Sequence, residues 1–377
     1  MSELTRVASG ISVGVSGAAC EVESIDTTLA GPAEQTESLR LADHTTFHIG
    51  GLAKRLVVAG SEAEIIDAVT SADAAGEPVL VLSGGSNVLV SDAGFDGTVI
   101  KIASRGVHAD VSSCGGGLVR VEAGENWDAF VDYAVSQEWI GIEALSGIPG
   151  LVGSTAIQNV GAYGADVSDT IAVVRTLDRT TGRFATFPLV ECRFAYRDSR
   201  FKREPGRYVV LQVSFQFELG TLSAPIRYAE LARALGVELG SRVDTRRVRQ
   251  AVLELRRSKG MVIDEADHDT WSAGSFFTNP ILTPAEAAAL PPAAPRFPQP
   301  DGRVKTSAAW LIDHAGFHKG FGTPPATLST KHALALTNRG GASADDVVAL
   351  ARQVRGGVRD AFGIDLKPEP VLVGLDL

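Results

Sequence analysis

Residues 79–87 of this 377-residue chain are VLVLSGGSN, an apolar run followed at once by small and polar residues. The consecutive aliphatic residues Val79 to Leu82 predict a buried strand, and the glycines after them predict a tight turn. Before this strand come another apolar run, Leu56 to Ala59, and a stretch with helical periodicity, Glu62 to Ala75. Strand, helix and strand in this order resemble a βαβ unit, so we expect a mixed α/β domain.

The chain further on continues to alternate between strand and helix patterns. Strands are expected at Gly117 to Ala123, Ile171 to Leu177 and Tyr208 to Phe217. Helices are expected at Trp127 to Glu138 and at Arg242 to Lys259. By its length the chain should form two or three domains.

A last helix is expected to begin at Ser343, because Asp346 stands three residues on in a capping pattern. It should end near Phe362 and bury Val347, Val348, Leu350, Ala351, Val354 and Val358. The Pro-rich stretch Leu290 to Gly302 predicts an irregular loop. Residues 1 to about 40 lack clean periodicity and predict a loosely ordered extension.

The composition, with 45% hydrophobic and 21% charged residues, is that of a soluble globular protein. A formal net charge of −10 argues against a nucleic-acid binder, because phosphate contacts need clustered Lys and Arg. No apolar run reaches the roughly 20 residues that cross a bilayer, and the opening residues MSELTRVASG lack a signal-peptide pattern. We therefore expect a cytoplasmic protein without nucleic-acid or membrane partners.

The cysteines Cys20, Cys114 and Cys192 are odd in number, far apart and without a C-x-x-C pair. This spacing suggests neither a disulfide framework nor a zinc site, so free thiols are expected. His314 and His318 have helical i, i+4 spacing, but no Glu-containing metal motif surrounds them. A structural or surface role is expected for both, and no metal site is predicted.

Two glycine-rich segments carry the first functional signal. In Ser83 to Asn87, small residues would let backbone N–H groups approach a phosphate, whereas a plain tight turn is the structural alternative. In Gly147 to Gly164, five glycines among polar residues suit close backbone passage along an extended ligand. A two-loop dinucleotide cradle is compatible with both. The fingerprint G-x-G-x-x-G is absent from the chain, so a Rossmann domain is not supported.

Six segments occur in the order found in the UDP-N-acetylenolpyruvoylglucosamine reductase family, which the chain resembles over about residues 41 to 377. They are TTFHIGG (45–51), GGSNVLVSD (84–92), GIPGLVGSTAIQNVGAYG (147–164), FAYRDSRFK (194–202), AGSFFTNP (273–280) and LKPEPVLVG (366–374). The resemblance implies a mixed α/β (α+β) fold, with a two-part FAD-binding module of the vanillyl-alcohol-oxidase type and a C-terminal α+β substrate-binding domain.

The domain boundaries that this resemblance implies are a flexible extension at 1–38, FAD-binding subdomain 1 at 39–104 with 366–377 returning to it, FAD-binding subdomain 2 at 105–240, and a UDP-sugar domain at 241–365. The implied contacts to the FAD pyrophosphate are Gly84, Gly85, Ser86 and Asn87. The implied lining of the rest of the cofactor is Ile148, Pro149, Gly153, Ser154, Gln158, Asn159 and Gly161.

The catalytic residues that the resemblance implies are Arg197, Ser275 and Glu369. Arg197 would hold the enolpyruvyl group, because a guanidinium offers a carboxylate a planar fork and stays charged. Ser275 would donate a proton, which requires a strongly basic acceptor such as an enolate. Glu369 would manage the enolate charge beside a cation. The structural alternatives are an ion pair of Arg197 with Asp198 or another acid, a turn cap, and a solvated Glu in a Pro-rich turn.

The implied substrate-binding residues, besides Arg197, are Tyr163, Tyr196, Tyr228, Lys259 and Asn279. Tyr228 indicates the subclass in which a loop carrying a Tyr folds over the substrate. The sequence departs from the family pattern in its longer N-terminal extension, in Thr278 at the usual Lys position, and in a lengthened stretch between Lys259 and Ser275.

The reaction that the resemblance implies is ping-pong: NADPH reduces FAD, and UDP-N-acetylglucosamine enolpyruvate then becomes UDP-N-acetylmuramate for peptidoglycan, in a monomer. One alternative is another FAD oxidoreductase of the same fold acting on a sugar or alcohol, which would not need Arg197, Ser275 and Glu369 together. The other is a non-catalytic UDP-sugar-binding protein, which would be expected to have lost the proton donor or the acid.

Overall fold

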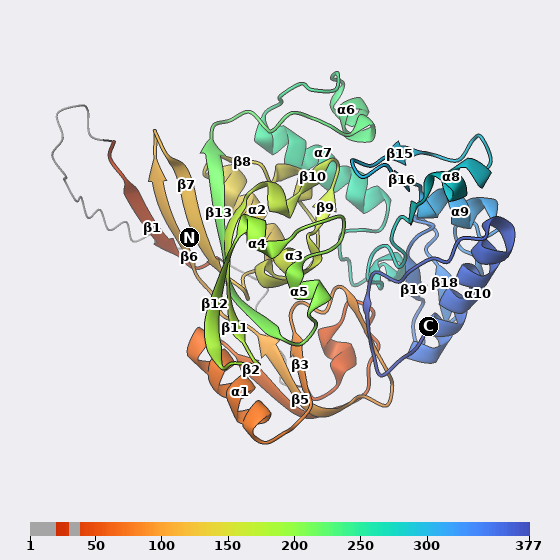
Figure 1. Ribbon diagram of the computed structural model, residues 1–377, viewed down its shortest axis with the longest axis horizontal. Helices are drawn as coiled ribbons and strands as arrows, with labels where there is room; N and C mark the ends of the chain where they lie inside the picture. The colour runs from red at the N-terminus through yellow and green to blue at the C-terminus, as the bar shows by residue number, and fades with distance from the viewer. Residues whose placement is uncertain (1–19, 30–37) are drawn as a thin grey trace. The chain divides into compact units, whose positions relative to one another are not determined.

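The computed structural model describes residues 20–29 and 38–377 (Figure 1). The described part of the chain forms two compact units, of which unit 1 comprises residues 20–29, 55–84 and 97–256 and unit 2 comprises residues 38–54, 85–96 and 257–377. Each unit is assembled from separate segments, so each depends on contacts between residues far apart in the sequence.

The strands of unit 1 are β1 (Glu23–Thr27), β2 (Ala53–Ala59), β3 (Val79–Leu82), β5 (Phe95–Ile102), β6 (Val107–Ser112), β7 (Gly116–Glu122), β8 (Trp139–Ile140), β9 (Gly161–Ala162), β10 (Ala165–Asp166), β11 (Ile171–Asp178), β12 (Arg183–Pro188) and β13 (Tyr208–Leu219). Its helices are α1 (Glu62–Ala74), α2 (Trp127–Ser136), α3 (Val152–Gln158), α4 (Leu189–Cys192), α5 (Arg200–Arg203), α6 (Ala229–Leu235) and α7 (Thr245–Ser258), with 3-10 turns η2 (Glu143–Leu145) and η3 (Val167–Asp169). The elements β2, β5 and α7 each cross the boundary between units by two residues.

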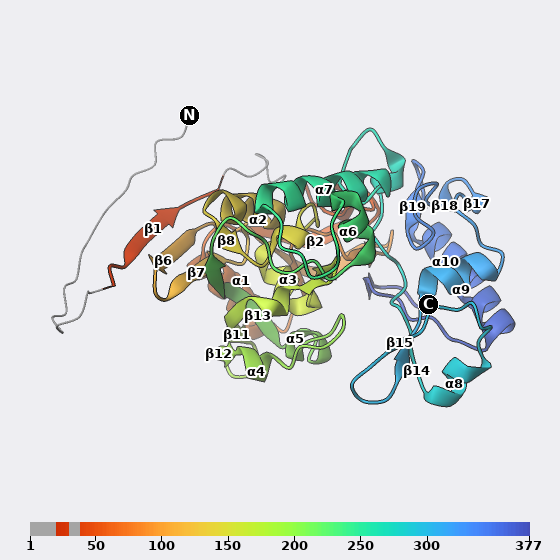
Figure 2. The ribbon, with the colours of Figure 1, turned by 90° about the horizontal axis from the view of Figure 1, so that it is seen from above.

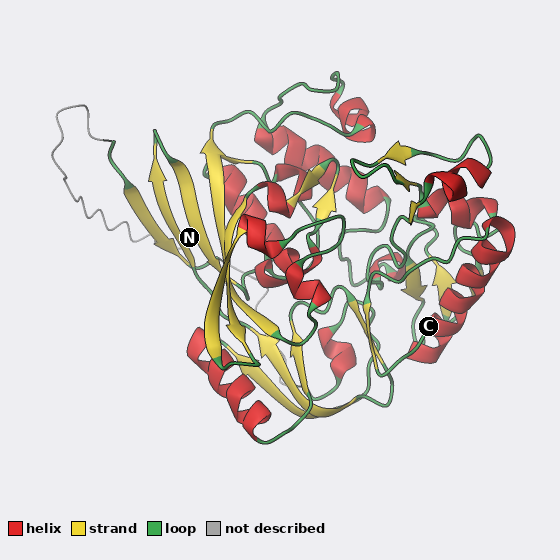
Figure 3. Cartoon of the chain, viewed as in Figure 1, coloured by secondary structure: helices red, strands yellow, loops and turns green. Residues whose placement is uncertain are grey.

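A seven-stranded antiparallel sheet dominates unit 1, in the order β1-β6-β7-β13-β11-β12 with β8 paired to β13 (Figure 3). Its strands alternate, so that Val119 and Val121 on β7 are fully buried while the residues between and after them lie on the other face. The buried face packs in one cluster with Trp127 and Phe130 of α2 and Ala156 of α3. The sheet thereby supports the loops at both ends of α3.

A smaller sheet in the order β2-β5-β3 contains the strand on which the sequence analysis began. The predicted strand, helix and strand are present, with Ser61 capping α1 by accepting from the Glu64 N–H. The expected βαβ unit is corrected in one respect: β3 pairs in parallel with β5, which lies between β2 and β3. Local periodicity predicts that a segment is a strand but not which strand it pairs with, because pairing depends on the topology of the whole sheet.

The elements of unit 2 are η1 (Leu41–His44), β4 (Val88–Val90), η4 (His268–Thr270), β14 (Ile281–Leu282), α8 (Pro284–Ala289), β15 (Phe297–Pro298), β16 (Val304–Lys305), α9 (Ala308–His314), β17 (Gly322–Thr323), β18 (Ala326–Leu328), β19 (Leu336–Asn338), α10 (Ala344–Phe362) and β20 (Val371–Val373). The strands form the small sheets β14-β16-β15 and β17-β18-β19 and the parallel pair β20-β4. Figure 2 shows α9 and α10 beside β17, β18 and β19.

The predicted last helix is confirmed as α10. Its capping box is complete, because Ser343 Oγ accepts from the Asp346 N–H and the Asp346 carboxylate accepts from the Ser343 N–H. All six apolar residues expected on its inner face are buried. The Pro-rich stretch 290–302 is irregular apart from the two-residue strand β15.

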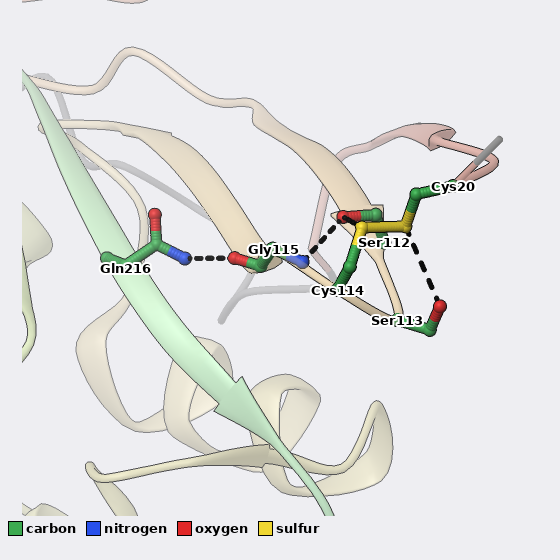
Figure 4. The surroundings of a disulfide bond; sticks show 6 residues. All are labelled: Cys20, Ser112, Ser113, Cys114, Gly115 and Gln216. Atoms are coloured by element: carbon green, nitrogen blue, oxygen red, sulfur yellow. Dashed lines mark hydrogen bonds between the residues drawn. A yellow bond between two sulfur atoms is a disulfide. The ribbon is translucent and has the colours of Figure 1, made fainter. Parts of the chain in front are cut away.

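The N-terminal extension differs from expectation where it is described. Residues Glu23–Thr27 form β1, which pairs with β6, whereas residues 1–19 and 30–37 lie outside the described part. The expectation of free thiols is wrong for Cys20 and Cys114, which form a disulfide (Figure 4). Their sequence separation of 94 gives no indication of proximity, because only the strand pairing brings them together. Cys192 is a buried free thiol, as expected.

Within residues 20–29 and 38–377, no helix is long and apolar enough to cross a membrane, and no cluster of three or more His, Cys, Asp or Glu side chains could hold a metal. The Nδ1 atom of His314 lies 2.9 Å from the Trp310 carbonyl oxygen, and that of His318 lies 2.8 Å from Asp313 Oδ1. Both histidines therefore make ordinary local contacts on and after α9.

Candidate functional site

The two glycine-rich loops predicted from the sequence lie against each other in unit 1. A Cβ atom on Gly84 would stand 2.8 Å from the Cα of Gly150, and one on Gly153 would stand 2.7 Å from the Cβ of Ala123. Side chains cannot be accommodated at these separations, so the backbones approach as only glycine allows. Gly84 and Gly150, one from each glycine-rich segment, are therefore in close contact.

Ser83 begins the first loop and shows what kind of ligand the loop suits. Its Oγ is buried and has no hydrogen-bond partner in the structure. A buried hydroxyl left unsatisfied costs about 1–3 kcal/mol, so such a group usually marks a position where a ligand or water completes the bonding. A hydroxyl and closely packed backbone in one loop fit the oxygens of a pyrophosphate.

The same loop continues into unit 2 at Gly85. This residue has a φ of 62°, and a Cβ there would stand 1.8 Å from the His44 carbonyl oxygen. The Gly85 carbonyl accepts from the Thr46 N–H at 3.1 Å. Two residues on, Asn87 Nδ2 donates to the Glu369 carbonyl at 3.3 Å, and the Asn87 carbonyl accepts from the Val371 N–H at 3.0 Å. Asn87 and Glu369 are therefore adjacent in unit 2.

The end of α3 is tied to the segment that carries Arg197. Asn159 is buried in a left-handed conformation with φ 42°, and its Nδ2 donates to the Ala195 carbonyl at 2.8 Å. Gln158 Oε1 accepts from Lys202 Nζ at 2.8 Å, and Ser154 Oγ donates to the Leu151 carbonyl at 2.7 Å. These polar side chains, expected to line a cofactor, thus also hold the neighbouring loops in place.

Arg197 is held by the hairpin of β9 and β10. It has a φ of 52°, and its Nη2 donates to the Gly161 carbonyl at 2.5 Å while its Nη1 donates to the Asn159 carbonyl at 3.4 Å. Asp198 pairs instead with Arg203, at 2.7 Å, whereas Asp166 lies 3.9 Å from Arg197. Asp198 is therefore paired with Arg203, and the alternative of an ion pair of Arg197 with another acid is present at Asp166. A left-handed residue whose guanidinium is braced on backbone carbonyls is preorganised to present its charge.

Tyr163 and Tyr228 form an edge-to-face pair in unit 1, with ring centroids 5.7 Å apart. Burial raises the pKa of Tyr163 to about 12, and burial also raises the pKa of Tyr228. The close passage of the two segments requires Gly164, because a Cβ there would stand 3.0 Å from the Cβ of Arg227. Both phenols stay neutral at physiological pH and act as hydrogen-bonding groups.

Arg256 is a residue that the sequence analysis did not single out. Burial lowers its pKa to about 10, while Tyr163 and Asp128 favour its charge and Arg197 opposes it. It lies in the last turn of α7 and stands three residues before Lys259 in the sequence. This spacing of two cations was the signal in the sequence that could have found it.

Ser275 and Glu369 are brought together in unit 2 by main-chain pairing. The Glu369 N–H donates to the Phe276 carbonyl at 2.8 Å, and Phe277 and Pro368 form an isolated β-bridge. Phe276 and Phe277 are buried and anchor the Ser275 segment. Asn279, a residue of the predicted site, accepts through its Oδ1 from the N–H of Ala308, the first residue of α9, at 2.9 Å. Lys259 lies directly after α7.

Comparisons with known proteins match two parts of the chain to described families. Residues 53–187 match the family described as FAD binding domain, and residues 265–373 match the family described as UDP-N-acetylenolpyruvoylglucosamine reductase, C-terminal domain. A crystal structure of UDP-N-acetylenolpyruvylglucosamine reductase from Thermus caldophilus shares the fold, with a TM-score of 0.61 and 24% identity over 94% of this chain and 99% of that one.

Sequence relatives are closer than the structural one. The UDP-N-acetylenolpyruvoylglucosamine reductase of Cutibacterium acnes is 60% identical, over 94% of this chain and 93% of its own length. The reductase of the same name from Streptomyces avermitilis is 55% identical, over 89% and 94% respectively. The glycine loops and the FAD-binding domain define an FAD-binding oxidoreductase of mixed α/β fold. At these identities the chain belongs to the UDP-N-acetylenolpyruvoylglucosamine reductase family.

Proposed function

We propose that the chain catalyses the NADPH-dependent reduction of UDP-N-acetylglucosamine enolpyruvate to UDP-N-acetylmuramate, a precursor of peptidoglycan. The observation that carries this proposal is the main-chain pairing that sets Ser275 beside Glu369, in a chain whose Arg197 is braced on the β9-β10 hairpin. The reaction needs an acid, a carboxylate clamp and a group that manages developing charge, and Ser275, Arg197 and Glu369 are of the chemical types that would supply them. Membership of the family supports the same substrate.

The FAD site fits the residues present. Gly84, Gly85, Ser86 and Asn87 would hold the pyrophosphate, with the orphaned Ser83 hydroxyl as a further donor. The remaining lining would be Ile148, Pro149, Gly153, Ser154, Gln158, Asn159 and Gly161. When bound, FAD supplies the two-electron reduction chemistry that amino-acid side chains lack.

The chain's own residues would then bind, orient and protonate. The guanidinium of Arg197 would bind the substrate carboxylate and polarise the adjacent double bond. Glu369 would stabilise the enolic form, and the Ser275 hydroxyl would deliver a proton to its carbon. Substrate-binding residues would be Tyr163, Tyr196, Tyr228, Lys259 and Asn279, with Tyr228 and Lys259 on the diphosphate.

The test is an anaerobic two-step titration. Added NADPH should bleach the flavin absorbance, and added UDP-N-acetylglucosamine enolpyruvate should restore it. The Ser275→Ala variant should bleach like the wild type but recover more slowly by about 10²- to 10⁴-fold, the usual contribution of a positioned acid. The control is Thr278→Ala, which removes a hydroxyl of the same loop that contacts the Lys367 carbonyl at 3.5 Å, and it should recover normally.

Two results would overturn the proposal. If only oxygen restores the absorbance of the wild type, the chain acts on another substrate. If Ser275→Ala recovers at the wild-type rate, Ser275 is not the proton donor.

A further inference from the structure

The disulfide between Cys20 and Cys114 joins the N-terminal segment to the turn between β6 and β7 (Figure 4). Their Cα atoms are 6.4 Å apart, within the ordinary range for a bridged pair. Cys20 stands just before β1, and Cys114 lies between the last residue of β6 and the first of β7. The bond therefore lies at one end of the β1-β6 ladder.

Besides the disulfide, β1 is attached by its ladder to β6, by side-chain contacts and by Ile25, which packs against the core of unit 1. Five residue pairs form the antiparallel ladder, from Glu23 opposite Val111 to Thr27 opposite Val107. Ser24 Oγ donates to Asp110 Oδ1 at 2.9 Å, and Asp26 contacts His108. No residue of β1 is fully buried. An edge strand of five residues, none of them fully buried, gains from a covalent bond at its end, so the disulfide contributes to its attachment.

Both sulfur atoms belong to exposed residues, which is the first condition for exchange with an external thiol. Hydroxyl groups flank them: Ser113 Oγ lies 3.7 Å from Cys20 Sγ, and Ser112 Oγ lies 3.9 Å from Cys114 Sγ. A hydroxyl at this range can solvate the thiolate that leaves when the bond is attacked. Access and a solvated leaving group favour reversible exchange.

The third cysteine, Cys192, does not take part in thiol–disulfide exchange at neutral pH. Cys192 is fully buried, and burial raises the pKa of its thiol to about 12. The thiolate is the reactive species, so Cys192 is inert at neutral pH. The chain has three cysteines, and hence only one pair that can exchange.

We propose that Cys20 and Cys114 form a reversible thiol–disulfide modification site that fastens β1 over the edge of β6. An external dithiol would attack one sulfur, breaking the bond to the other, and its second thiol would resolve the mixed disulfide. The chain would gain two electrons and two protons as two thiols, and the dithiol would leave as a disulfide. An oxidised disulfide reagent would run the exchange in reverse.

Release of β1 has two structural consequences within unit 1. The backbone N–H and C=O groups of β6 that pair with β1 would become an open edge. A cavity of about 590 Å³ would also lose part of its wall, since Asp26, Thr27 and Thr28 line it together with residues 60–62 and 104–108. The redox state of the pair would thus set both the exposure of this edge and the enclosure of this cavity.

The experiment uses the full-length wild-type chain in two states, after incubation with oxidised glutathione and after incubation with dithiothreitol, both without denaturant. Alkylation in denaturant followed by mass spectrometry should count one free thiol in the first state and three in the second. Hydrogen exchange of the β6 amides, residues 107–112, should be faster in the reduced state by about tenfold or more.

Matched variants separate the bond from the reagent. Cys114→Ser should exchange like the reduced wild type in either reagent. Cys192→Ala removes the inert thiol and should keep the full difference between the two states. Three free thiols after the oxidant, one free thiol after dithiothreitol, or equal β6 exchange in the two states would each overturn the proposal.

Discussion

Replacement of Gly85 by alanine tests whether the close backbone approach in the first glycine loop is what forms the cofactor site. The new Cβ would stand 1.8 Å from the His44 carbonyl oxygen and 2.8 Å from the Thr45 Cα. No flexible side chain can move away, because both obstacles are main-chain atoms. The φ of 62° would add the strain of a left-handed conformation.

The magnitude follows from these two costs. The left-handed conformation costs an alanine roughly 1–2 kcal/mol. Displacing the His44–Thr45 backbone adds an overpacking cost of about 1–3 kcal/mol. The variant should therefore lose about 2–5 kcal/mol in the conformation that binds FAD. Because about 1.4 kcal/mol is a factor of ten, even the lower value weakens retention of FAD by more than tenfold.

The assay is the ratio of flavin to protein absorbance after gel filtration, together with urea unfolding of the flavin-free protein. The control is Gly363→Ala in the same unit, where φ is 70° and no heavy atom lies within 4 Å of the new Cβ. It carries the conformational strain without the overlap and should retain FAD. The reasoning is refuted if Gly85→Ala matches Gly363→Ala in both flavin content and unfolding midpoint.

The remaining predictions concern the supports of the site. Burial alone would raise the pKa of Asp128, but hydrogen bonds from Arg249 at 2.6 Å and from the Gly147 N–H at 2.6 Å outweigh it and leave that pKa below the ordinary 3.8. Asp128→Asn should therefore cost about 1–2 kcal/mol in urea unfolding at pH 7. The wild type holds this stability above the unfolded pKa and loses it as pH falls through the lower folded pKa, so the gap between the two proteins should narrow as the pH falls below 3.8; a constant gap would contradict this. Gly164→Ala should displace the Tyr228 segment and raise the KM for the UDP-sugar by about tenfold, or about 1.4 kcal/mol, while leaving flavin reduction by NADPH unchanged. The control is Gly182→Ala, with φ 65° and open space around the new Cβ. Equal KM values for the two variants would contradict the inference that Gly164 is needed for the position of the Tyr228 segment.

Several features of this protein could be predicted from local sequence. The start of α10 followed from Ser343 and Asp346, and its buried face followed from apolar spacing. The strands at Val79–Leu82 and Tyr208–Leu219 were expected for similar reasons. Local pattern was sufficient here because capping and period depend on residues within one or two turns.

The site residues were predictable only because ordered motifs resemble a family. On residue type alone, Ser275 suits a turn cap and Arg197 an ion pair as well as they suit chemistry. The structure adds contacts that no local pattern indicates, because it pairs the backbones at Phe277 and Pro368 and pairs Asp198 with Arg203.

The amino-acid order by itself determined the strand Val79–Leu82, the helix α10 and the two glycine loops, because these depend on backbone freedom and on burial repeated at short intervals. Only the tertiary structure decided that Gly84 meets Gly150, that β5 separates β2 from β3, and that Cys20 reaches Cys114. These contacts join residues far apart in the chain. The distances between these residues are set by strand register and by the packing of the whole unit, and neither can be predicted from a local sequence pattern.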